Sequence, residues 1–370
     1  MKLTINTQKL LENILSSNLT IDNFNINPFL TGIYIKVSDN IVSLTSSNLN
    51  TSSYITIKDG FKIEEEGEIL IKGSTLLNLL QHIKDKEISI NKVENNVVNI
   101  TTENGVYNLN LFNKESFPAL SFDNQNWLSF ELDNELIKKI SSNITPCVVV
   151  TNDLTRVYNG ISIKSNDETK QIEITGTDGH HLAYLKQSFN GPKFDIIISL
   201  ETLNFLEKII KGVKTKFYLN NQKMIIEVEE NLFLCKLIEG KFRSMDKALN
   251  ENYPNHFIVN KKEFENIINI SMILATNDKR PTINLEIKKN QININTINNE
   301  CGSSSQKIKI INTNITQNYT INLNIKLIQH ILKAFNGEEI KFNFIDENRQ
   351  ILITNDKDSE LMFLIMPIRS

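Results

Sequence analysis

The chain has little cysteine, and it lacks the segments that direct proteins to or across membranes. Only three of its 370 residues are cysteines, Cys147, Cys235 and Cys301, and they are widely spaced. Disulfide frameworks use even numbers of cysteines in short secreted chains, and no Cys-x-x-Cys or Cys/His spacing typical of zinc occurs. Residues 1–6 do not begin a signal peptide, and no stretch approaches the roughly 18 apolar residues of a membrane helix. These absences predict a protein of a reducing cytoplasm.

An excess of charge of either sign is also missing. The formal net charge is -3, although charged residues make up 22% of the chain and apolar residues 40%. A protein that gripped nucleic acid with its whole surface would be strongly basic, so any such contact must be confined to one face. The length exceeds that of one ordinary core, which favours two or three domains.

Common catalytic motifs are absent as well. There is no Gly-rich phosphate loop, no nucleophile elbow and no His-Glu-x-x-His. The most distinctive short run is Thr-Asp-Gly-His-His-Leu-Ala at 177–183. Its Asp-Gly pair separates two alternating segments, 171–177 and 181–185, and therefore predicts a hairpin turn. Asp178, His180 and His181 leave a second interpretation open, a hydrolase or metal enzyme that uses these three side chains.

An internal repeat is the strongest pattern in the chain. Three short alternating segments each lead through a capping-type Asn or Asp into an amphipathic helix. Ile5, Leu132 and Val259 occupy equivalent places in them, 127 residues apart each time. A repeat of this kind is better supported when a second, independent set of equivalent positions recurs with nearly the same spacing.

A second marker does recur halfway through each third. Ile71, Ile198 and Leu323 end equivalent strands that run directly into helices, with spacings of 127 and 125 residues. Short strands with period-2 alternation and Asn, Asp or Gly turns follow each helix, which is typical of antiparallel meanders. The sequence therefore predicts an α+β protein of three tandem domains, 1–124, 125–251 and 252–370, each with two helices packed on antiparallel sheets.

Lysine is concentrated in the predicted helices. Within six windows, 7–17, 74–86, 134–145, 200–214, 261–274 and 325–335, lysines number twelve and acidic residues seven. Lysine is a flexible, hydrated charge suited to phosphate backbones without base readout. Lysines also solvate any exposed helix, but a repeat that places all six helices on one side favours a basic lining. The contributing residues are Lys9, Lys84, Lys86, Lys138, Lys139, Lys208, Lys211, Lys214, Lys261, Lys262, Lys326 and Lys333.

Several motifs give the chain a family resemblance. The run at 177–183 resembles the Thr-Asp-Gly-His-Arg-Leu-Ala signature of the beta subunit of bacterial DNA polymerase III, the replicative sliding clamp. The end of the chain, Met-Pro-Ile-Arg at 366–369, is similar to that family's terminus. The runs at 1–4, 44–49, 117–120 and 159–160 also match in order. The similarity covers essentially the whole chain.

The resemblance implies a non-catalytic processivity factor that needs no cofactor. Its three clamp domains would pair head to tail with those of a second copy and form a ring around double-stranded DNA without sequence specificity. The lysines above, together with Arg156, would face the DNA. Tyr107 and Leu109 of the first domain would meet Ile273 and Leu274 of the third domain across the dimer interface.

The resemblance also implies a pocket that captures short peptides from the replicative polymerase, the clamp loader and repair proteins. Apolar walls would give affinity, and a few polar groups would orient the peptide. The matching positions are Tyr158, Thr177, Gly179, His180, His181, Leu182, Lys247, Asn324, Leu327, Leu364, Met366, Pro367, Ile368 and Arg369.

This chain departs from the family pattern at several of these places. His181 replaces the usual Arg, Leu327 a frequent Tyr, and Tyr158 a Leu. The segment 241–249 is far from the family's Arg-Phe-Pro-Asp-Tyr run, and Phe24 stands where a DNA-contacting Arg often lies. The location of the pocket is unaffected by these changes, whereas its peptide preference is expected to differ.

Overall fold

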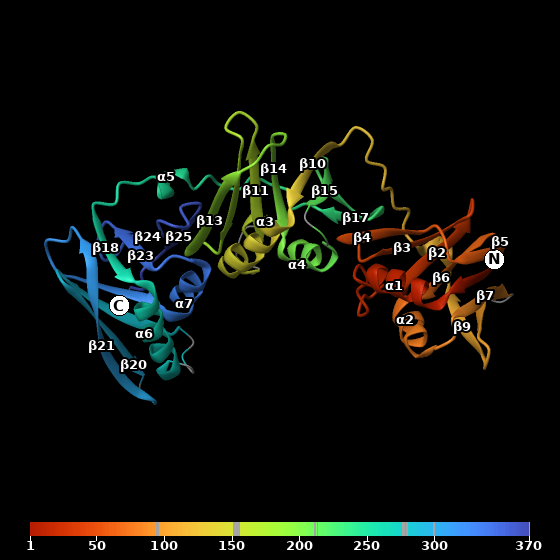
Figure 1. The fold of residues 1–370 in the computed structure, drawn as a ribbon, viewed down its shortest axis with the longest axis horizontal. Helices are drawn as coiled ribbons and strands as arrows, with labels where there is room; N and C mark the ends of the chain where they lie inside the picture. The colour runs from red at the N-terminus through yellow and green to blue at the C-terminus, as the bar shows by residue number, and fades with distance from the viewer. Residues whose placement is uncertain are drawn as a thin grey trace. The chain divides into compact units, whose positions relative to one another are not determined.

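The chain forms two compact units, whose residues can be followed in Figure 1 with its colour bar. The computed structural model describes residues 1–93, 96–150, 156–210, 212, 214–275, 278, 280–298 and 300–369, with the backbone alone at Arg156. Unit 1 comprises Met1–Glu135 and Glu201–Leu237, and unit 2 comprises Leu136–Leu200 and Ile238–Ser370. The middle third of the sequence is therefore divided between the two units.

Unit 1 is built on one antiparallel sheet of 13 strands, in the order β10-β15-β16-β17-β4-β3-β2-β6-β9-β8-β7-β1-β5. Its helices are α1 (Thr7–Asn18), α2 (Gly73–His82) and α4 (Leu200–Ile209). Its strands are β1 (Lys2–Asn6), β2 (Gly32–Ser38), β3 (Ile41–Ser47), β4 (Thr51–Ile57), β5 (Phe61–Glu65), β6 (Gly67–Lys72), β7 (Glu87–Val93), β8 (Val97–Thr101), β9 (Val106–Phe112), β10 (Leu128–Asp133), β15 (Lys214–Leu219), β16 (Lys223–Val228) and β17 (Asn231–Lys236).

Unit 2 repeats the design with 12 antiparallel strands, in the order β14-β11-β12-β13-β25-β24-β23-β18-β21-β20-β19-β22. The chain enters it within α3 (Asn134–Lys139), which continues as a π-helical turn, Ile140–Ile144; the other helices are α5 (Asp246–Leu249), α6 (Lys261–Leu274) and α7 (Ile325–Ala334). Its strands are β11 (Gly160–Asn166), β12 (Gln171–Thr177), β13 (His181–Ser188), β14 (Phe194–Ser199), β18 (Asn255–Asn260), β19 (Thr282–Lys288), β20 (Gln291–Asn298), β21 (Gly302–Thr313), β22 (Tyr319–Asn324), β23 (Glu339–Phe344), β24 (Ile351–Thr354) and β25 (Leu361–Ile365).

Polar side chains mark the helix starts at which the sequence repeats. Asn6 and Asn260 each accept a hydrogen bond, at 2.9 Å, from the backbone N–H three residues later. Asp133 accepts one at 3.0 Å from the N–H two residues later. These bonds satisfy N–H groups that have no partner within the helix, which is why Asn and Asp are favoured there. The predicted strand-cap-helix units are confirmed.

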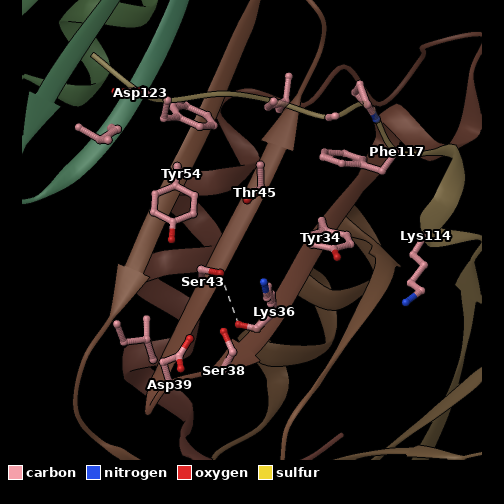
Figure 2. A pocket seen from close by; sticks show the side chains of 16 residues that line it. Tyr34, Lys36, Ser38, Asp39, Ser43, Thr45, Tyr54, Lys114, Phe117 and Asp123 are labelled. Atoms are coloured by element: carbon pink, nitrogen blue, oxygen red, sulfur yellow. Dashed lines mark hydrogen bonds between the residues drawn. The ribbon is translucent and has the colours of Figure 1, made fainter. Parts of the chain in front are cut away.

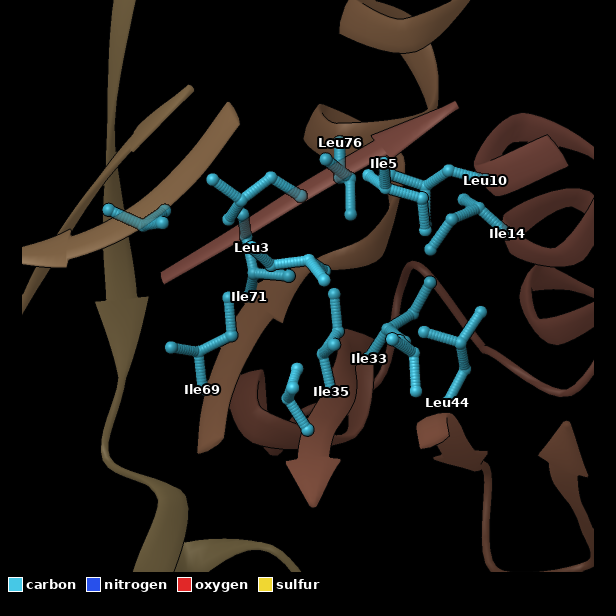
Figure 3. Packing of buried hydrophobic residues seen from close by; sticks show 14 of the residues in the cluster. Leu3, Ile5, Leu10, Ile14, Ile33, Ile35, Leu44, Ile69, Ile71 and Leu76 are labelled. Atoms are coloured by element: carbon cyan, nitrogen blue, oxygen red, sulfur yellow. The ribbon is translucent and has the colours of Figure 1, made fainter. Parts of the chain in front are cut away.

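The core of unit 1 lies between its first two helices and the sheet. Leu10 and Ile14 of α1 and Leu76 and Leu80 of α2 are at most 1% exposed and pack on strand residues such as Ile33 (Figure 3). Each buried aliphatic side chain stabilises the fold by about 1.5–3 kcal/mol relative to exposure. Burial of one apolar stripe per helix therefore fixes both helices on the same face of the sheet.

Aromatic rings fill the corresponding core of unit 2. The rings of Phe257 on β18 and Phe342 on β23 stack with centroids 4.7 Å apart. Phe264 of α6 meets Phe342 edge-on at 5.6 Å, and Phe335, after α7, meets Phe363 at 5.5 Å. The predicted α+β class, with helices packed on antiparallel sheets, is confirmed.

Candidate functional site

The connection between β12 and β13 is a tight turn fixed by its own side chains. The Oδ1 atom of Asp178 accepts hydrogen bonds from the backbone N–H groups of His180 and His181, at 2.8 and 2.7 Å. The Thr177 hydroxyl accepts from the N–H of Gly179 at 3.0 Å and donates to the carbonyl oxygen of His181. Gly179 has a φ of 88°, which a residue with a side chain rarely adopts. The predicted hairpin is confirmed.

The Asp178 carboxylate also holds the His181 ring. Its Oδ2 atom lies 2.8 Å from Nδ1 of that ring, and both side chains are 16% exposed. Burial raises the pKa of Asp178, but hydrogen bonds from the His181 side chain and the two backbone N–H groups outweigh it and leave that pKa below its usual value. The His180 side chain is exposed. Asp178 and His181 therefore shape the turn.

The end of the chain is attached to this turn. β25 pairs with β13, and beyond it the N–H of Met366 donates to the carbonyl of His180 at 3.0 Å. The N–H of Ile368 donates to the carbonyl of Asn322 on β22 at 2.8 Å. The predicted pocket residues of the tail are exposed Met366 and Arg369 and half-buried Pro367 and Ile368. The structure thus brings the tail and the turn together.

Two of the predicted pocket residues lie in a small core. Leu182 on β13 and Leu364 on β25 are 5% and 8% exposed and pack with Leu249 and with the ring of Tyr184. Burial raises the pKa of the Tyr184 hydroxyl. The segment around α5 covers this cluster, since Met245 packs against it. Leu182 and Leu364 are therefore core residues next to the turn and the tail, and their side chains are not exposed at the surface.

The remaining predicted pocket residues come from separate elements. The Asn324 side chain caps α7 by accepting from the N–H two residues later at 2.9 Å, and Leu327 is half-buried on that helix. The ring of Tyr158 meets that of Phe242 edge-on at 5.2 Å, and Lys247 is exposed on α5. Backbone contacts join Asn322, two residues before Asn324, to the tail.

Some of the lysines that were predicted to lie in helices lie outside them in the structure. Lys84 and Lys86 follow α2, which ends at His82, and Lys214 begins β15, because α4 ends at Ile209. Their placement in helices was therefore wrong. With the observed bounds, the six predicted helices carry eight lysines and six acidic residues, so the helical excess of positive charge is smaller than the windows suggested. Lys211 lies outside the described residues, as does the side chain of Arg156.

Several helical lysines have partners inside the protein. Lys9 forms an ion pair with Asp59, and Lys139 lies 3.9 Å from a Glu360 carboxylate oxygen. The Lys261 ammonium donates to the carbonyl of Phe335 at 2.5 Å, which ties the start of α6 to the end of α7. The remaining helical lysines, Lys138, Lys208, Lys262, Lys326 and Lys333, are exposed.

The predicted dimer residues lie on two elements with exposed apolar side chains. Tyr107 on β9 is 40% exposed, and Leu109 on the same strand packs against the core of unit 1. Ile273 on α6 is 70% exposed, and Leu274 beside it is half-buried. Val106, which sequence reasoning missed, is 58% exposed next to Tyr107 and extends the apolar edge.

Comparison with known proteins assigns the chain along its whole length. Models of the N-terminal, central and C-terminal domains of the DNA polymerase III beta subunit match residues 1–121, 131–244 and 246–369. The beta sliding clamp of Bacillus subtilis is 24% identical over 382 residues and that of Mycoplasma capricolum 23% over 376, covering at least 99% of each chain. The solved DNA polymerase III beta chain of Streptococcus pneumoniae superposes with a TM-score of 0.90 at 21% identity, with 100% of both chains covered.

The chain belongs to the DNA polymerase III beta subunit family. It is a sliding clamp, a DNA polymerase processivity factor of DNA replication without catalytic activity. The alternative of a hydrolase or metal enzyme is not supported. Within the part of the chain that the structure describes, no three His, Cys, Asp or Glu side chains are grouped as metal ligands, and no helix has the length and apolarity needed to cross a bilayer.

This clamp contains a second copy of the turn, which sequence reasoning missed. The Oδ1 atom of Asn48, 130 residues before Asp178, accepts from the N–H groups of Asn50 and Thr51 at 3.0 and 2.8 Å. The Ser47 hydroxyl accepts from the N–H two residues later at 3.0 Å. The N–H of Lys236, the last residue of β17, donates to the Asn50 carbonyl at 2.9 Å, just as the N–H of Met366 donates to the His180 carbonyl in unit 2. Both turns use a hydroxyl side chain followed by an Asn or Asp side chain, although the residues themselves differ: Ser47 and Asn48 in one, Thr177 and Asp178 in the other.

Unit 1 of this clamp carries a hollow of about 740 Å³ over strands β2, β3 and β4, shown in Figure 2. The segment after β9 crosses the sheet there, and its Phe117 stacks on Tyr34 with centroids 5.7 Å apart. Phe122 meets Tyr54 at 5.6 Å further along. Two aromatic pairs thus hold this connecting segment, which includes the Phe-Pro-Ala-Leu run of the family, against the sheet.

Proposed function

We propose that two copies of this chain close head to tail into a ring around duplex DNA and tether the replicative polymerase to it. The observation that carries this proposal is the match of three successive clamp-domain models to one chain, in the order of the domains. A closed ring holds its DNA by topology, so tight binding is unnecessary. The net charge of only -3 fits such loose contact.

DNA contact is proposed for lysines on the helices and their flanks. Lys138, Lys208, Lys262, Lys326 and Lys333 are exposed on α3, α4, α6 and α7. Ammonium groups that touch phosphate oxygens position a protein on DNA without reading its sequence. Lys84, Lys86 and Lys214 remain candidates at helix flanks, together with Lys9, Lys139, Lys211, Lys261 and Arg156.

A dimer contact is proposed between β9 of one copy and α6 of the other copy. Residues 106–110 of β9 pair with β8, while the pairing with β6 is confined to residues 111–112. In the described part of unit 1, the other side of 106–110 therefore has no strand beside it. An exposed strand edge with apolar side chains is normally covered in a stable protein. Tyr107, Leu109, Ile273 and Leu274 would meet in the covered interface.

Peptide capture is proposed at the surface where the turn 177–181 meets the C-terminal tail. Exposed Met366 and half-buried Leu327 offer apolar contacts, while His180 and Arg369 offer exposed polar groups. Peptide sites typically combine an apolar surface with a few such polar groups. His181 in place of Arg, held by Asp178, makes this surface less positive than the family pattern and favours less acidic peptides.

Three further expectations belong to this proposal. The domains extend over 1–124, 125–251 and 252–370, close to the three matched segments. The clamp acts in the cytoplasm, where bacterial DNA is replicated. The clamp loader and repair proteins use the same peptide surface as the polymerase.

The ring is tested by retention on DNA of different topology. The clamp is loaded by its clamp loader onto nicked circular duplex, and free protein is removed by gel filtration. Half of the sample is then linearised with a restriction enzyme. We expect the clamp to stay on the circle and to leave the linear DNA by sliding off its ends.

A matched sample carries linear DNA whose ends are blocked by bound streptavidin, and retention should return there. Equally fast loss from circular and linear DNA would contradict encirclement. Equal retention on open linear DNA would show ordinary binding affinity and contradict the proposal as well.

A further inference from the structure

Unit 2 contains a cavity of about 660 Å³ between α3 with its π-helical turn, α7 and the loop that joins β24 to β25. Three lysines line it: Lys139 from α3, Lys333 from α7 and Lys357 from the loop. All three side chains are exposed, so solvent reaches them. Lys357 lies outside every predicted helix, which is why sequence reasoning missed it.

The carboxylates of this cavity are already occupied. Asp358 accepts hydrogen bonds from the backbone N–H of Asn336 at 2.6 Å and from its side-chain amide at 3.2 Å. Glu360 lies 3.9 Å from the Lys139 ammonium. Neither Lys333 nor Lys357 has an ion-pair partner among the described residues. Three lysines thus face two carboxylates, Asp358 and Glu360, which leaves the lining with a net charge of +1.

The imidazole in the cavity wall contributes no charge near neutral pH. Burial lowers the pKa of His330, although the hydrogen bond to Asn143 opposes that effect. Its Nε2–H donates to the Asn143 carbonyl at 3.3 Å, so the neutral ring is held in the wall. The cavity therefore depends on its lysines for any attraction to an anion.

Unit 1 carries a cavity of the same construction with opposite charge. It measures about 450 Å³ and lies between α1, α4 and the β16–β17 turn. Its Lys208 is the ninth residue of α4, as Lys333 is of α7, but Glu12 is the sixth residue of α1, where Lys139 is the sixth of α3. Glu229 lines it as well. The basic lining of unit 2 is therefore a property of its residues and not of the fold.

We propose that the cavity formed by Lys139, Lys333 and Lys357 binds a phosphate group. Ammonium groups are compact point charges that attract phosphate oxygens without demanding one geometry. If the phosphate belongs to the DNA backbone, the inference rests on the proposed function. Unit 2 then has a defined contact with DNA that unit 1 lacks. A free phosphate anion would meet the same chemistry.

The DNA source is tested with the double variant Lys333→Gln/Lys357→Gln of the full chain. Equilibrium binding to a short duplex is measured by fluorescence anisotropy over a series of salt concentrations. We expect the slope of log affinity against log salt to become shallower by about 0.9 for each phosphate that the variant no longer neutralises. The charge-matched control, Lys288→Gln/Lys289→Gln at the exposed β19–β20 turn, is expected to keep the wild-type slope.

The free-anion source is tested by soaking crystals of the wild-type chain in sodium tungstate. An anomalous peak in the unit 2 cavity, with none in the unit 1 cavity, supports the site; a peak without any slope change assigns it to free phosphate. An unchanged slope together with no peak overturns the inference. The ring proposal fails if the wild-type protein leaves circular and linear DNA equally fast. Only the present inference fails if the wild-type protein stays on the circle, the double variant keeps the wild-type slope and no peak forms.

Discussion

Asp178 shows how one carboxylate can define a surface without taking part in chemistry. Its two oxygens accept from two backbone N–H groups and from the His181 ring, and each bond exists only while the turn is formed. The second turn of the molecule uses Asn48 for the same backbone bonds. One oxygen of Asp178 therefore holds the turn, and the other holds the His181 ring.

Replacing Asp178 by Ala is expected to lower the free energy of unfolding by about 1–3 kcal/mol, because two backbone N–H groups and the His181 ring lose a charged acceptor. Asp178→Asn should cost less, since an amide oxygen still accepts from the backbone as Asn48 does. Urea unfolding followed by circular dichroism at pH 7 compares the three proteins. Equal unfolding midpoints for wild type and Asp178→Ala would contradict this role.

The same aspartate predicts a pH dependence. Because the pKa of Asp178 is lowered in the folded protein, its charge stabilises the fold fully above its ordinary value of 3.8. That contribution is lost as the pH falls through the lowered folded pKa. The difference in stability between wild type and Asp178→Asn should accordingly shrink as the pH falls below 3.8.

At the scale of elements, the starts of the helices could be predicted and their ends could not. The starts of α1, α3, α6 and α7 each combine a strand, a polar cap and an apolar stripe, and these signals are local. α2 ends before Ile83 without a Gly or Pro to announce it, and α4 ends three residues before Gly212. Packing sets those ends, so Lys84, Lys86 and Lys214 were assigned to helices wrongly.

The apolar side chain of Ile273 on α6 leads to a prediction about the dimer. Ile273→Asp would place a charge in the proposed interface, where a buried isoleucine contributes about 1.5–3 kcal/mol. A two-copy ring contains the contact twice, so the dissociation constant should rise by at least about 100-fold. Analytical ultracentrifugation measures it. Ile297→Asp, at a site 75% exposed on β20, is the matched control and should remain dimeric.

Ile273→Asp protein that stays as dimeric as the Ile297→Asp control would show that α6 lies outside the interface. Loss of the dimer in both variants would point to a general effect of the new charge. Only a selective effect at Ile273 supports the contact.

At the scale of the whole molecule, the number of domains could be predicted but their joining could not. The 127-residue period is visible in single letters such as Ile5, Leu132 and Val259. The pairing of β17 with β4, and of β25 with β13, joins strands more than 170 residues apart in sequence. Such partners are chosen by tertiary packing, because any alternating strand can pair with any other.

The C-terminal tail makes the separation of ring and peptide surface testable. Deleting residues 366–370 removes the bonds to the His180 and Asn322 carbonyls but leaves β25 paired with β13. Binding of a peptide from the replicative polymerase, followed by fluorescence anisotropy, should weaken by more than about 100-fold, because central interface side chains each contribute about 2 kcal/mol or more.

Met366→Ala, which keeps the tail backbone in place, should weaken peptide binding by a smaller factor than the deletion. The dimer should persist in both variants, because the proposed dimer residues lie on β9 and α6. A monomeric deletion protein would show that the tail supports the interface between copies, and it would contradict the placement of the peptide surface apart from that interface.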